Sequence, residues 1–489
     1  MIDYSNIQTA SAEPEPSAMI ETLRSIGYSL PSAVADIIDN SISAEAGNIW
    51  ITRDWSGGKS VITIKDDGRG MTGEEIKKAL RPGSQNPNEI RSLRDLGRFG
   101  LGLKTASFSQ CLRVTVLSKK KGESADYWSW DLEYVAQFHS WKLIKWIPDG
   151  FENSLDGLES GTIIIWSALD RILRLDTPST DVKAHEKFSH DLDRVHQHIA
   201  MTFHRFIEDR DIKIWWCGKE VQPWNPFCID EKKTQPQPED SIAGGITIKG
   251  FILPHPKNFS SEQACKVAEG MNGWTSHQGF YVYRGKRLIL AGSWLGLFKK
   301  EEPYKLVRIM IDLPNTQDSL WKIDIKKSQA YPPAGCREQL MAYAKDLRGK
   351  GWEVYRHKGK IIKQRAKEEW QPLWLDKKKD DKWSFVINRD NTVIKGLREM
   401  AKTQPDRAIE TLLKLIEDTI PTASIYAVEA SSEEHVKEPY TGCTADELRP
   451  IASIIYGNLR SAGLTPEQAK GRLLMQEPFN FFEELIDSL

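Results

Sequence analysis

The sequence has little cysteine: six residues among 489, with no CxxC pair. This pattern excludes a zinc ribbon and offers no framework of disulfides, so it favours reduced thiols in a cytoplasm. Long apolar runs are also absent, since no stretch approaches the roughly 18 apolar residues that cross a bilayer. The polar N-terminus, residues 1–17, lacks the apolar core of a signal peptide. We therefore expect a cytoplasmic protein that is neither secreted nor inserted in a membrane.

The sequence also lacks an excess of charge of either sign. It carries 67 Lys and Arg residues against 68 Asp and Glu residues, for a formal net charge of -1. This balance excludes a protein that binds nucleic acid through an overall basic surface, but it leaves room for a local basic patch. With 489 residues, of which 40% are hydrophobic, the chain is long enough for a globular protein of about three domains.

Hydrophobic periodicity predicts an α+β fold rather than alternating βαβ units. Two helices are expected over residues 17–46, separated near Pro31, because proline suits the first turn of a helix. Alternating segments on both sides of residues 56–58 predict a β-hairpin that ends at Asp66. A polar segment over residues 81–98 precedes the glycine-rich sequence GRFGLGLKTASFS, and several strand-like segments follow it.

The same patterns divide the chain into four parts. We expect a first domain over residues 1–175, a connecting helix over residues 176–210, and a second α+β domain over residues 211–336 that begins with the strand-like sequence IKIWW. Helical patterns dominate residues 337–489 and predict a mainly helical C-terminal domain. Histidines recur along the connecting helix without an i,i+4 pair or an HExxH motif, so surface histidines are expected rather than a metal site. These histidines are His185, His190, His196, His198 and His204.

The sequence ADIIDNSISA at residues 35–44 places polar side chains among isoleucines in an expected buried helix. Asp36 and Asn40 lie one helical turn apart and share a face, while the isoleucines turn toward a core. A carboxylate there can position or deprotonate a water molecule, and a carboxamide oxygen is a hard ligand that suits Mg²⁺. The alternative is an ordinary amphipathic helix with one polar stripe at the surface.

A second polar motif, KDDGRGM at residues 65–71, ends the expected hairpin. A carboxylate accepts a hydrogen bond from an exocyclic amine, so Asp66 can select adenine. Gly68 and Gly70 let the backbone pass close to a ligand. Further along, the hydroxyl of Thr162 in SGTIIIW could join this network through water. Taken singly, an Asp-Gly turn and a Gly-Thr pair are also ordinary features of a polypeptide.

The third motif, GRFGLGLK, contains Gly97, Gly100 and Gly102 before Lys104. Backbone amides of glycines, a helix N-terminus and a lysine together form a cradle for phosphate groups. The spacing matches neither GxxxxGK[ST] nor GxGxxG after a strand, which excludes a P-loop and a Rossmann fold. A flexible glycine hinge is the alternative.

In this order the motifs resemble those of the Bergerat-fold ATPases, the GHKL group of gyrase, heat-shock chaperone, histidine kinase and MutL. ADIIDNSISA is similar to the N box, DDGRGM to the adenine box, GRFGLGLKTAS to the glycine box that closes the lid, and the Gly-Thr pair to the last motif. The resemblance implies an Hsp90-like α+β sandwich that binds ATP and Mg²⁺. Asp36 then takes the place of the general base, Asn40 that of the magnesium ligand and Asp66 that of the adenine-binding residue.

The resemblance also implies a larger set of ATP-binding residues. Those of the base pocket are Gly68, Gly70 and Met71. Those of the glycine box, next to the phosphates, are Gly97, Phe99, Gly100, Leu101, Gly102, Leu103, Lys104 and Thr105. Thr162 belongs to the adenine side.

Two positions depart from the family pattern. Asp36 stands where Glu is usual, and Ser43 stands where Asp is usual. The carboxylate of Asp36 lies roughly one C–C bond farther from the attacking water, and a misplacement of about 1 Å can lower the rate about a hundredfold. Slow hydrolysis is therefore predicted, with ATP binding but no hydrolysis as the alternative.

The sequence GLKTAS is similar to the MORC and MutL-like branch of the family. In that branch the ATPase domain is followed by a transducer of ribosomal protein S5-like fold, whose loop lysine reaches the γ-phosphate. The segment WKIDIKKSQAYPP, residues 321–333, is placed to form that loop after the strand-like VRIMIDL. The resemblance therefore implies Lys327 as the sensor, with Lys326 as the second choice. A solvated surface pair of lysines is the alternative.

A basic stretch over residues 345–379 carries twelve Lys and Arg residues against five acidic ones, with tryptophans and a tyrosine interleaved. Such a stretch can contact phosphates and gain free energy by counterion release, which favours DNA as a partner. A solvated helix whose tryptophans pack beneath it is the alternative.

We therefore expect a prokaryotic GHKL ATPase of MORC/MutL type that forms a homodimer on binding ATP and acts on DNA or on partner proteins. The resemblance suggests restriction-modification or phage defence as its setting. Two alternatives stay open: an ATPase subunit like the B subunit of topoisomerase VI, which needs a separate cleaving subunit, and an ATP-binding scaffold in which Asp36 does not hydrolyse ATP.

Overall fold

The computed structural model of the chain describes residues 8, 14–25, 27–83, 102–242, 244–314, 320–321, 331–356, 373–379, 382–429, 435–436, 444–476, 478–479 and 482–489. The chain divides into two compact units, residues 1–358 and residues 359–489. Among the described residues, every helix is too short or too polar to cross a membrane.

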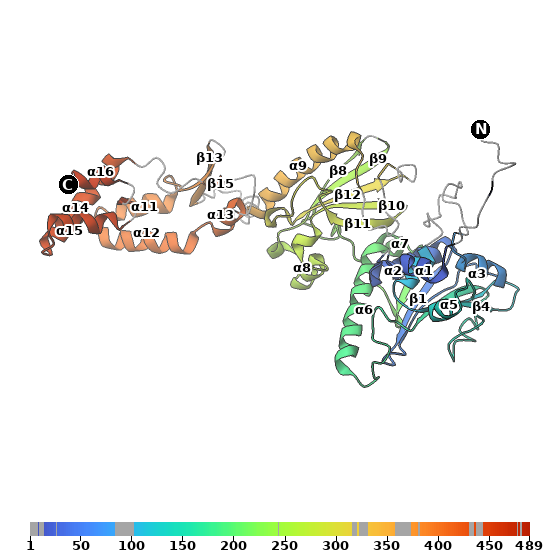
Figure 1. The fold of residues 1–489 in the computed structure, drawn as a ribbon. Helices are drawn as coiled ribbons and strands as arrows, with labels where there is room; N and C mark the ends of the chain where they lie inside the picture. Colours follow the sequence, from blue (N-terminus) through green and yellow to red (C-terminus); the bar gives the residue numbers. More distant parts are fainter. Residues whose placement is uncertain are drawn as a thin grey trace. The chain divides into compact units, whose positions relative to one another are not determined.

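The first unit begins with helices packed on a mixed β-sheet (Figure 1). In the described residues this sheet has seven strands in the order β4-β3-β5-β2-β1-β6-β7. Its strands are β1 (Asn48–Asp54), β2 (Val61–Asp66), β3 (Arg113–Lys119), β4 (Asp126–Asp131), β5 (Gly161–Ser167), β6 (Lys213–Trp216) and β7 (Lys219–Glu220). Neighbouring strands are antiparallel except for β1 and β6, which are parallel. The predicted α+β class and the predicted hairpin of β1 and β2 are confirmed.

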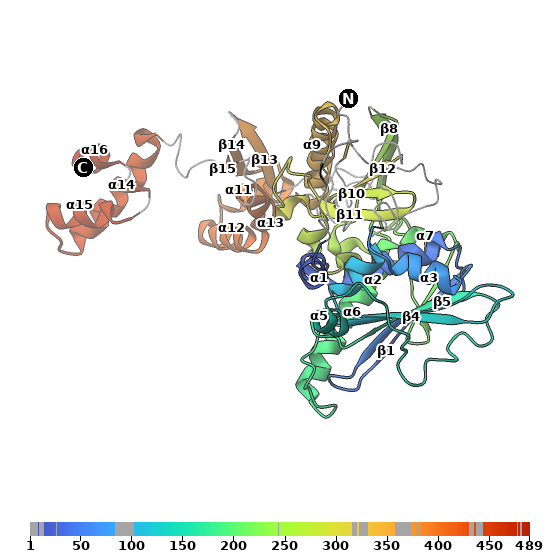
Figure 2. The ribbon, with the colours of Figure 1, turned by 45° about the vertical axis from the view of Figure 1, so that its right-hand side comes forward.

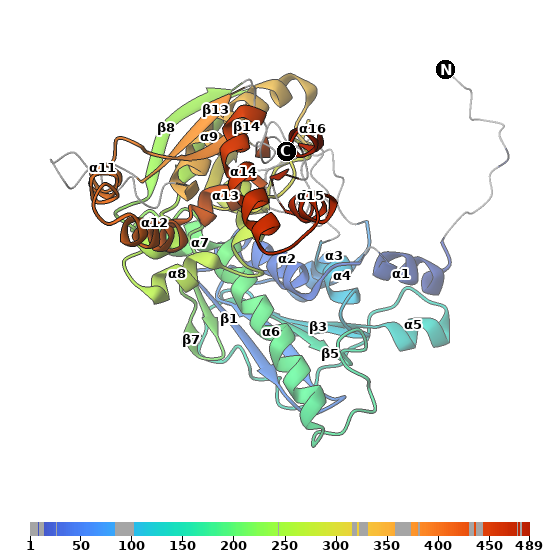
Figure 3. The ribbon, with the colours of Figure 1, turned by 90° about the vertical axis from the view of Figure 1, so that its left-hand side faces the viewer.

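Among the helices of this part, α2 contacts both α4 and α6. They are α1 (Pro16–Ser25), α2 (Leu30–Ser43), α3 (Gly73–Leu80), α4 (Gly102–Phe108), α5 (Leu132–Phe138), α6 (Val182–Thr202) and α7 (His204–Glu208). Helix α1 lies beside α5 (Figure 2 and Figure 3), and the long α6 runs along the sheet (Figure 3). The break between α1 and α2 that Pro31 predicted is present.

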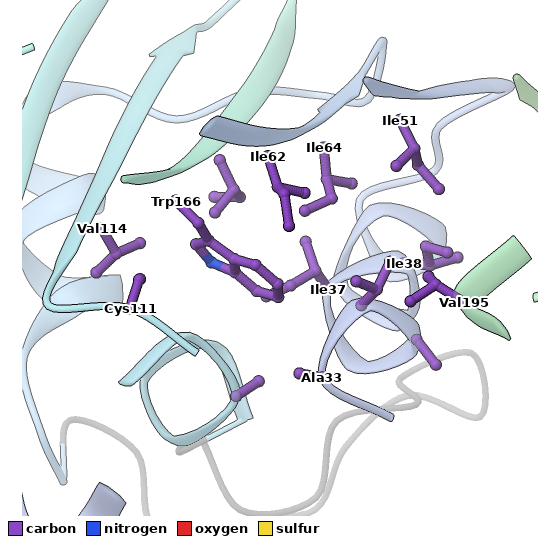
Figure 4. Packing of buried hydrophobic residues seen from close by; sticks show 14 of the residues in the cluster. Ala33, Ile37, Ile38, Ile51, Ile62, Ile64, Cys111, Val114, Trp166 and Val195 are labelled. Carbon is purple, nitrogen blue, oxygen red and sulfur yellow. The ribbon is translucent and has the colours of Figure 1, made fainter. Parts of the chain in front are cut away.

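Local sequence explains where α2 begins. The side chain of Ser29 accepts a hydrogen bond from the backbone amide of Ser32, and Pro31 stands in the first turn, where its missing amide has no partner to lose. All residues from 33 to 39 are buried, so the middle of the helix is covered on every side. Ile37 of α2 and Ile62 of β2 lie next to the ring of Trp166 in the core (Figure 4), and all three are at most 1% exposed. Helix α2 is thus fixed against the sheet by close packing.

The segment IKIWW lies in the first sheet, which corrects the expectation that it opens the second domain. Strand β6 pairs in parallel with β1, with Asn48 opposite Lys213 and Ile51 opposite Trp216. Ile214 is fully buried in the same core cluster as Ile49. A short apolar strand pattern does not specify its partner sheet, and here α6 and α7 return the chain to the side of β1 that β2 leaves open.

A second sheet follows within the first unit. In the described residues it has five strands in the order β11-β10-β12-β9-β8, and β10 and β12 are parallel. The strands are β8 (Gln235–Ile242), β9 (Ile246–Ile252), β10 (Gly279–Arg284), β11 (Arg287–Ser293) and β12 (Val307–Leu313). The connections contain η1 (Pro256–Asn258), α8 (Glu262–Glu269), η2 (Trp274–His277) and η3 (Glu302–Tyr304). The second sheet therefore begins at Gln235, within the first unit.

Helix α9 (Ala334–Arg356) packs on this second sheet. Its buried side chains Leu340, Ala344 and Leu347 share a core cluster with Ile248 and Ile309. A Cβ atom added at Gly351 would lie 2.3 Å from Cγ2 of Val307, so only glycine permits this close approach. The first unit therefore ends at Lys358 rather than at residue 336, where the sequence suggested the last domain boundary.

The second unit contains a small sheet and a set of helices. The strands β13 (Trp374–Lys379), β14 (Lys382–Ile387) and β15 (His435–Val436) are adjacent in that order. The helices are α11 (Thr392–Met400), α12 (Pro405–Thr419), α13 (Thr422–Glu429), α14 (Ala445–Ser461), α15 (Pro466–Leu474) and α16 (Glu483–Asp487). The basic stretch, residues 345–379, is divided: its start ends α9, its end forms β13, and residues 357–372 lie outside the described residues.

Candidate functional site

The two polar residues that the sequence singled out on α2 differ in exposure. Asp36 is only 4% exposed, whereas Asn40 is exposed. The hydroxyl of Tyr28 donates a 2.8 Å hydrogen bond to Oδ2 of Asp36. A Cβ atom at Gly102, where α4 begins, would lie 3.5 Å from the same oxygen. The fold therefore brings Asp36 next to the first described residue of the glycine-rich segment.

Asp66 lies beside α2, at the end of β2. The hydroxyl of Ser41 donates a 2.8 Å hydrogen bond to Oδ2 of Asp66, and the amide of Gly68 donates a 2.9 Å bond to Oδ1. The residue is 5% exposed, and this burial raises the pKa of its carboxyl group against the opposing effect of the two hydrogen bonds. The carboxylate is thus oriented by two donors in a poorly solvated place.

The glycines after Asp66 are required by close contacts. Gly70 has a φ of +66°, and a Cβ atom there would lie 1.8 Å from the carbonyl oxygen of Lys119. At Gly68 a Cβ atom would lie 2.8 Å from the carbonyl oxygen of Ala44, the residue after α2. The loop can therefore pass between α2 and β3 only with glycine at these positions.

Met71 and Thr162 are joined by a residue that the sequence did not single out. Ser118 on β3 accepts a 2.8 Å hydrogen bond from the amide of Met71 and donates a 2.9 Å bond to the carbonyl of Gly161. Its Oγ also lies 2.8 Å from Oγ1 of Thr162, which is directly opposite Asp66 in the sheet. The predicted base-pocket residues thus meet at the ends of three neighbouring strands.

Lys104 is almost fully buried, with 2% exposure, at the start of α4. Its ammonium group donates hydrogen bonds of 2.9 Å to the carbonyl of Ala79 and 3.1 Å to that of Arg81. Burial lowers the pKa of Lys104 to about 8. The next residue, Thr105, is fully buried, and Leu103 is half-buried. Lys104 therefore caps the C-terminal end of α3 by bonding to its carbonyl groups.

Several predicted site residues lie outside the described residues. In the glycine-rich segment these are Gly97, Phe99, Gly100 and Leu101, and in the expected sensor loop they are Lys326 and Lys327. Their roles stay predictions.

One arginine from the second sheet reaches α2 and was missed in the sequence. Nε of Arg287, at the start of β11, lies 2.8 Å from both carboxylate oxygens of Asp39. A terminal nitrogen of the same guanidinium lies 3.7 Å from Oδ1 of Asp36. Arg287, Asp36 and Asp39 are all at most 4% exposed. No local signal identifies Arg287, because 248 residues separate it from Asp39.

The histidines near α6 form no metal site among the described residues. His185 and His190 are exposed, as expected. His204 is not a surface residue: it is 1% exposed, and its Nε2 lies 2.8 Å from the hydroxyl of Tyr283 on β10. Burial lowers the pKa of the half-buried His198 to about 4, and the nearby positive charge of Arg287 acts in the same direction.

A comparison with known protein families matches the segment that contains the described site residues. Residues 28–162 match the family model described as histidine kinase-, DNA gyrase B-, and HSP90-like ATPase. These residues are a GHKL ATPase domain. The matched segment begins at Tyr28 and ends at Thr162, so it contains α2, the loop after Asp66 and the start of α4. The predicted resemblance to GHKL ATPases is confirmed.

Relatives of the GHKL domain include mismatch repair and MORC proteins. The chain is 34% identical over 100 residues to the DNA mismatch repair protein MutL of Clostridium botulinum, which covers 20% of this chain and 14% of that protein. It is 35% identical over 101 residues to MutL of Chromohalobacter salexigens, covering 20% and 15%. It is 30% identical over 91 residues to ATPase morc-1 of Caenorhabditis elegans, covering 19% and 10%. The chain thus matches only about a seventh or less of the length of each of these relatives.

Proposed function

We propose that the chain is a Mg²⁺-dependent ATPase of MutL/MORC type that binds ATP between α2, the loop after β2 and α4, and hydrolyses it slowly. The observation that carries this proposal is the arrangement of Asp66, a buried carboxylate held by Ser41 and Gly68 at the edge of a loop that only glycine can form. The match of residues 28–162 to GHKL ATPases supports it.

The geometry at Asp66 suits adenine. A carboxylate offers about four acceptor positions, and Ser41 and Gly68 occupy two of them. The remaining positions can accept the exocyclic amine of adenine. Guanine presents a carbonyl oxygen in the corresponding place, which would meet the carboxylate as a second acceptor with no proton between them. We therefore propose that Asp66 selects ATP over GTP.

The residues of α2 suit the phosphate end of the nucleotide. Mg²⁺ in nucleotide sites is held by one or two protein oxygens together with phosphate oxygens and water, and the exposed carboxamide of Asn40 provides such an oxygen. When bound, the ion neutralises charge on the phosphates. Asp36 would accept a proton from the attacking water, and the hydroxyl of Tyr28 fixes the orientation of its carboxylate. Lys104 and the glycines of the glycine-rich segment would contact the phosphates, and Lys327 or Lys326 would sense the γ-phosphate from an S5-like transducer.

We further propose that ATP binding closes residues 81–98, of which residues 84–98 lie outside the described part of the chain, over the nucleotide and favours a homodimer of the N-terminal parts. The similarity to proteins named MutL and morc-1 supports this step, because the resemblance of the motifs to that branch implies dimerisation on binding ATP. Sedimentation of the full chain tests it. We expect a dimer at micromolar protein with a non-hydrolysable ATP analogue and Mg²⁺, and a monomer under these conditions would contradict the step.

DNA is the partner that we propose for the basic stretch at residues 345–379, and restriction-modification or phage defence is the proposed setting. The charge excess of that stretch and the similarity to a DNA mismatch repair protein support the first idea, and the second rests on the resemblance of the motifs alone. The affinity for duplex DNA should fall steeply with salt, since counterion release provides the driving force. An affinity that is independent of salt would contradict a phosphate-binding role.

The decisive experiment separates binding from hydrolysis. Equilibrium binding of ATP and GTP to the purified chain, with and without Mg²⁺, tests the site. Release of phosphate from ATP tests the reaction. Binding without any release would favour an ATP-dependent switch in which Asp36 does not act as a base.

A further inference from the structure

A hairpin of the second sheet places one arginine against the carboxylates of α2. Strands β10 and β11 are joined by Gly285 and Lys286, whose φ angles of +52° and +69° form the tight turn. Arg284 and Arg287 are paired across the end of this hairpin. Because the turn is this short, the position of Arg287 follows the position of the whole hairpin.

Arg287 joins two carboxylates that the sequence had assigned different roles. Its Nε bonds to both oxygens of Asp39 at 2.8 Å, one of its terminal nitrogens donates a 2.9 Å bond to the carbonyl of Leu288, and the other lies 3.7 Å from Oδ1 of Asp36. The planar guanidinium presents its donors in a fixed fork, so a shift of the hairpin changes its distance to both acids together. Since all three side chains are buried, water screens these charges weakly.

Other contacts hold the same hairpin to the first domain. Lys286 pairs with Asp209 at 2.6 Å and with Asp211 at 2.7 Å, just after α7. Tyr283 lies within hydrogen-bond distance of His204, and the guanidinium of Arg205 lies 3.5 Å from the centre of the Tyr283 ring. The hairpin is therefore docked on α7 by its tip and on α2 by Arg287.

We propose that Arg287 is a positioning residue that links the second domain to Asp36. This inference rests on the proposed role of Asp36 as the base of the ATPase. With Asp39 as its principal partner, Arg287 holds one terminal nitrogen 3.7 Å from Oδ1 of Asp36 and so places a positive charge beside that carboxylate. When the second domain moves relative to α2, Arg287 moves with it and the base changes its position and basicity. The nucleotide site and the second domain thereby share a contact that is independent of the lysines at residues 326 and 327.

The pH profile of hydrolysis tests this link. In the part of the chain that the structure describes, Tyr28 and Arg287 lie beside Asp36, Asp39 on α2 shares Arg287 with it, and His198 on α6 lies near Arg287 and Asp39. Replacing Asp39 by Asn leaves Asp36 as the only carboxylate for Arg287, so the acidic limb of the kcat profile should move to lower pH. Replacing both Asp39 by Asn and Arg287 by Gln removes the positive charge without leaving a buried carboxylate at position 39. The limb should then move to higher pH by about one unit.

Matched variants separate this role from a merely structural one. Lys286→Gln removes the neighbouring contacts to Asp209 and Asp211 but leaves α2 untouched, so the limb should keep its wild-type position. Arg287→Lys retains the positive charge but loses the forked donors of the guanidinium. Its acidic limb in the kcat profile should lie between that of the wild type and that of the double variant. Thermal unfolding of each variant shows whether it is folded at the assay temperature.

The outcomes distinguish the inference from the proposed function. Opposite shifts for Asp39→Asn and for the double variant, with the KM for ATP unchanged, support the link between Arg287 and Asp36. Profiles that coincide with the wild type, or that shift in the same direction, overturn it while the ATPase itself stands. A wild-type chain that releases no phosphate overturns the proposed base role of Asp36, and with it the inference.

Discussion

The hydroxyl of Ser41 donates a 2.8 Å hydrogen bond to the carboxylate of Asp66 and so joins the motif helix α2 to the end of β2. Ser41 follows Asn40 directly, and Asp66 precedes the loop that contains Gly68 and Gly70. This hydrogen bond therefore fixes the position of the proposed magnesium-binding residue, Asn40, relative to the proposed adenine-binding residue, Asp66. A change at Ser41 or Asp66 should affect nucleotide binding before it affects folding.

Replacing Asp66 by Asn should weaken ATP binding and leave the fold intact. A hydrogen bond to a charged group contributes about 1.5 to 3 kcal/mol, so the affinity should fall by about 10- to 100-fold. Isothermal titration measures this. Asp67→Asn is the control: Oδ2 of Asp67 accepts a 2.8 Å hydrogen bond from the side-chain amide of Asn48, and in the variant an NH2 group faces that donor, so this variant should lose stability and keep its affinity for ATP. If Asp67→Asn weakened ATP binding and Asp66→Asn did not, Asp66 would not be the adenine-binding residue.

The same Asp66 variant should be more stable than the wild type at neutral pH. Burial raises the pKa of Asp66 above its ordinary value of 3.8, so the folded state holds the proton more tightly than the unfolded state does. Ionisation therefore lowers the free energy of unfolding as pH rises through this window. Urea unfolding at pH 7 and pH 4 should show an advantage of Asp66→Asn at pH 7 that shrinks at pH 4. A constant difference would contradict the raised pKa.

Replacing Gly70 by Ala should destabilise the protein beyond the effect of backbone strain alone. Gly83 provides the matched control, since it has a similar φ of +68° but open space around its Cβ position. We expect Gly83→Ala to lower the free energy of unfolding by about 1 kcal/mol, and Gly70→Ala to lower it by more than about 2 kcal/mol because Lys119 must move. Equal effects in denaturant unfolding would show that the contact with β3 is readily relieved.

Binding of ATP should be accompanied by uptake of a proton near pH 8.5. The pKa of Lys104 is lowered to about 8, so at pH 8.5 the Lys104 side chain is neutral in most molecules of the free protein. A phosphate group nearby favours the charged form and draws a proton onto Lys104. Lys120, which pairs with Glu75 at 3.0 Å, provides the control lysine. Titrations in two buffers of different ionisation enthalpy should give different apparent heats for the wild type and for Lys120→Met, but equal heats for Lys104→Met. If the wild type gives equal heats in the two buffers, ATP binding does not protonate Lys104, which would contradict its contact with the phosphates.

Lys104 also predicts a dependence of stability on pH. The unfolded side chain keeps its proton up to about pH 10.5, so between pH 8 and 10.5 the unfolded state binds more protons than the folded one. The contribution of Lys104 to stability therefore rises with pH across this window, by up to about 3 kcal/mol. Between pH 7.5 and pH 9.5, the unfolding free energy of the wild type should therefore rise relative to that of Lys104→Met. A difference that is independent of pH would contradict the burial effect.

Much of the candidate site was predictable because its residues lie in short motifs. Asp36 and Asn40 follow from helical spacing, and Asp66 with its glycines follows from a strand end and a turn. Ser118 and Tyr28 were not predictable, because a single serine on a strand or a tyrosine before a helix carries no pattern. Their roles depend on the pairing of β3 with β5 and on the packing of α2.

Tertiary contacts explain the other differences from the sequence prediction. The strand IKIWW has the right alternation for a strand, but its parallel pairing with β1 depends on where α6 returns the chain. His204 is buried because Tyr283 of the second sheet meets it, and Arg287 reaches Asp39 across 248 residues. Periodicity reports which side of an element is apolar, and it does not report which distant element will cover that side.

Asp36→Glu tests the proposed reason for slow hydrolysis. The longer side chain moves the carboxylate toward the place that Glu occupies in the family, so kcat should rise, by up to about a hundredfold. Initial rates of phosphate release at saturating ATP measure this. The Asp36→Glu rate should fall again when Asn40 is replaced by Ala, if both residues act on the same nucleotide. A lower rate for Asp36→Glu than for the wild type would show that the pocket around Gly102 and Tyr28 is built for the shorter acid.

Phosphate release by the wild type and by Asp36→Asn, measured together with ATP binding, tests the central claim most directly. Asn keeps the size of the side chain and removes its ability to accept a proton. The account predicts slow, Mg²⁺-dependent release by the wild type, and release at the buffer rate with unchanged ATP binding for Asp36→Asn. Rates that are indistinguishable between the two proteins, whether both equal to buffer or both above it, would contradict the role of Asp36 as the base of an ATPase.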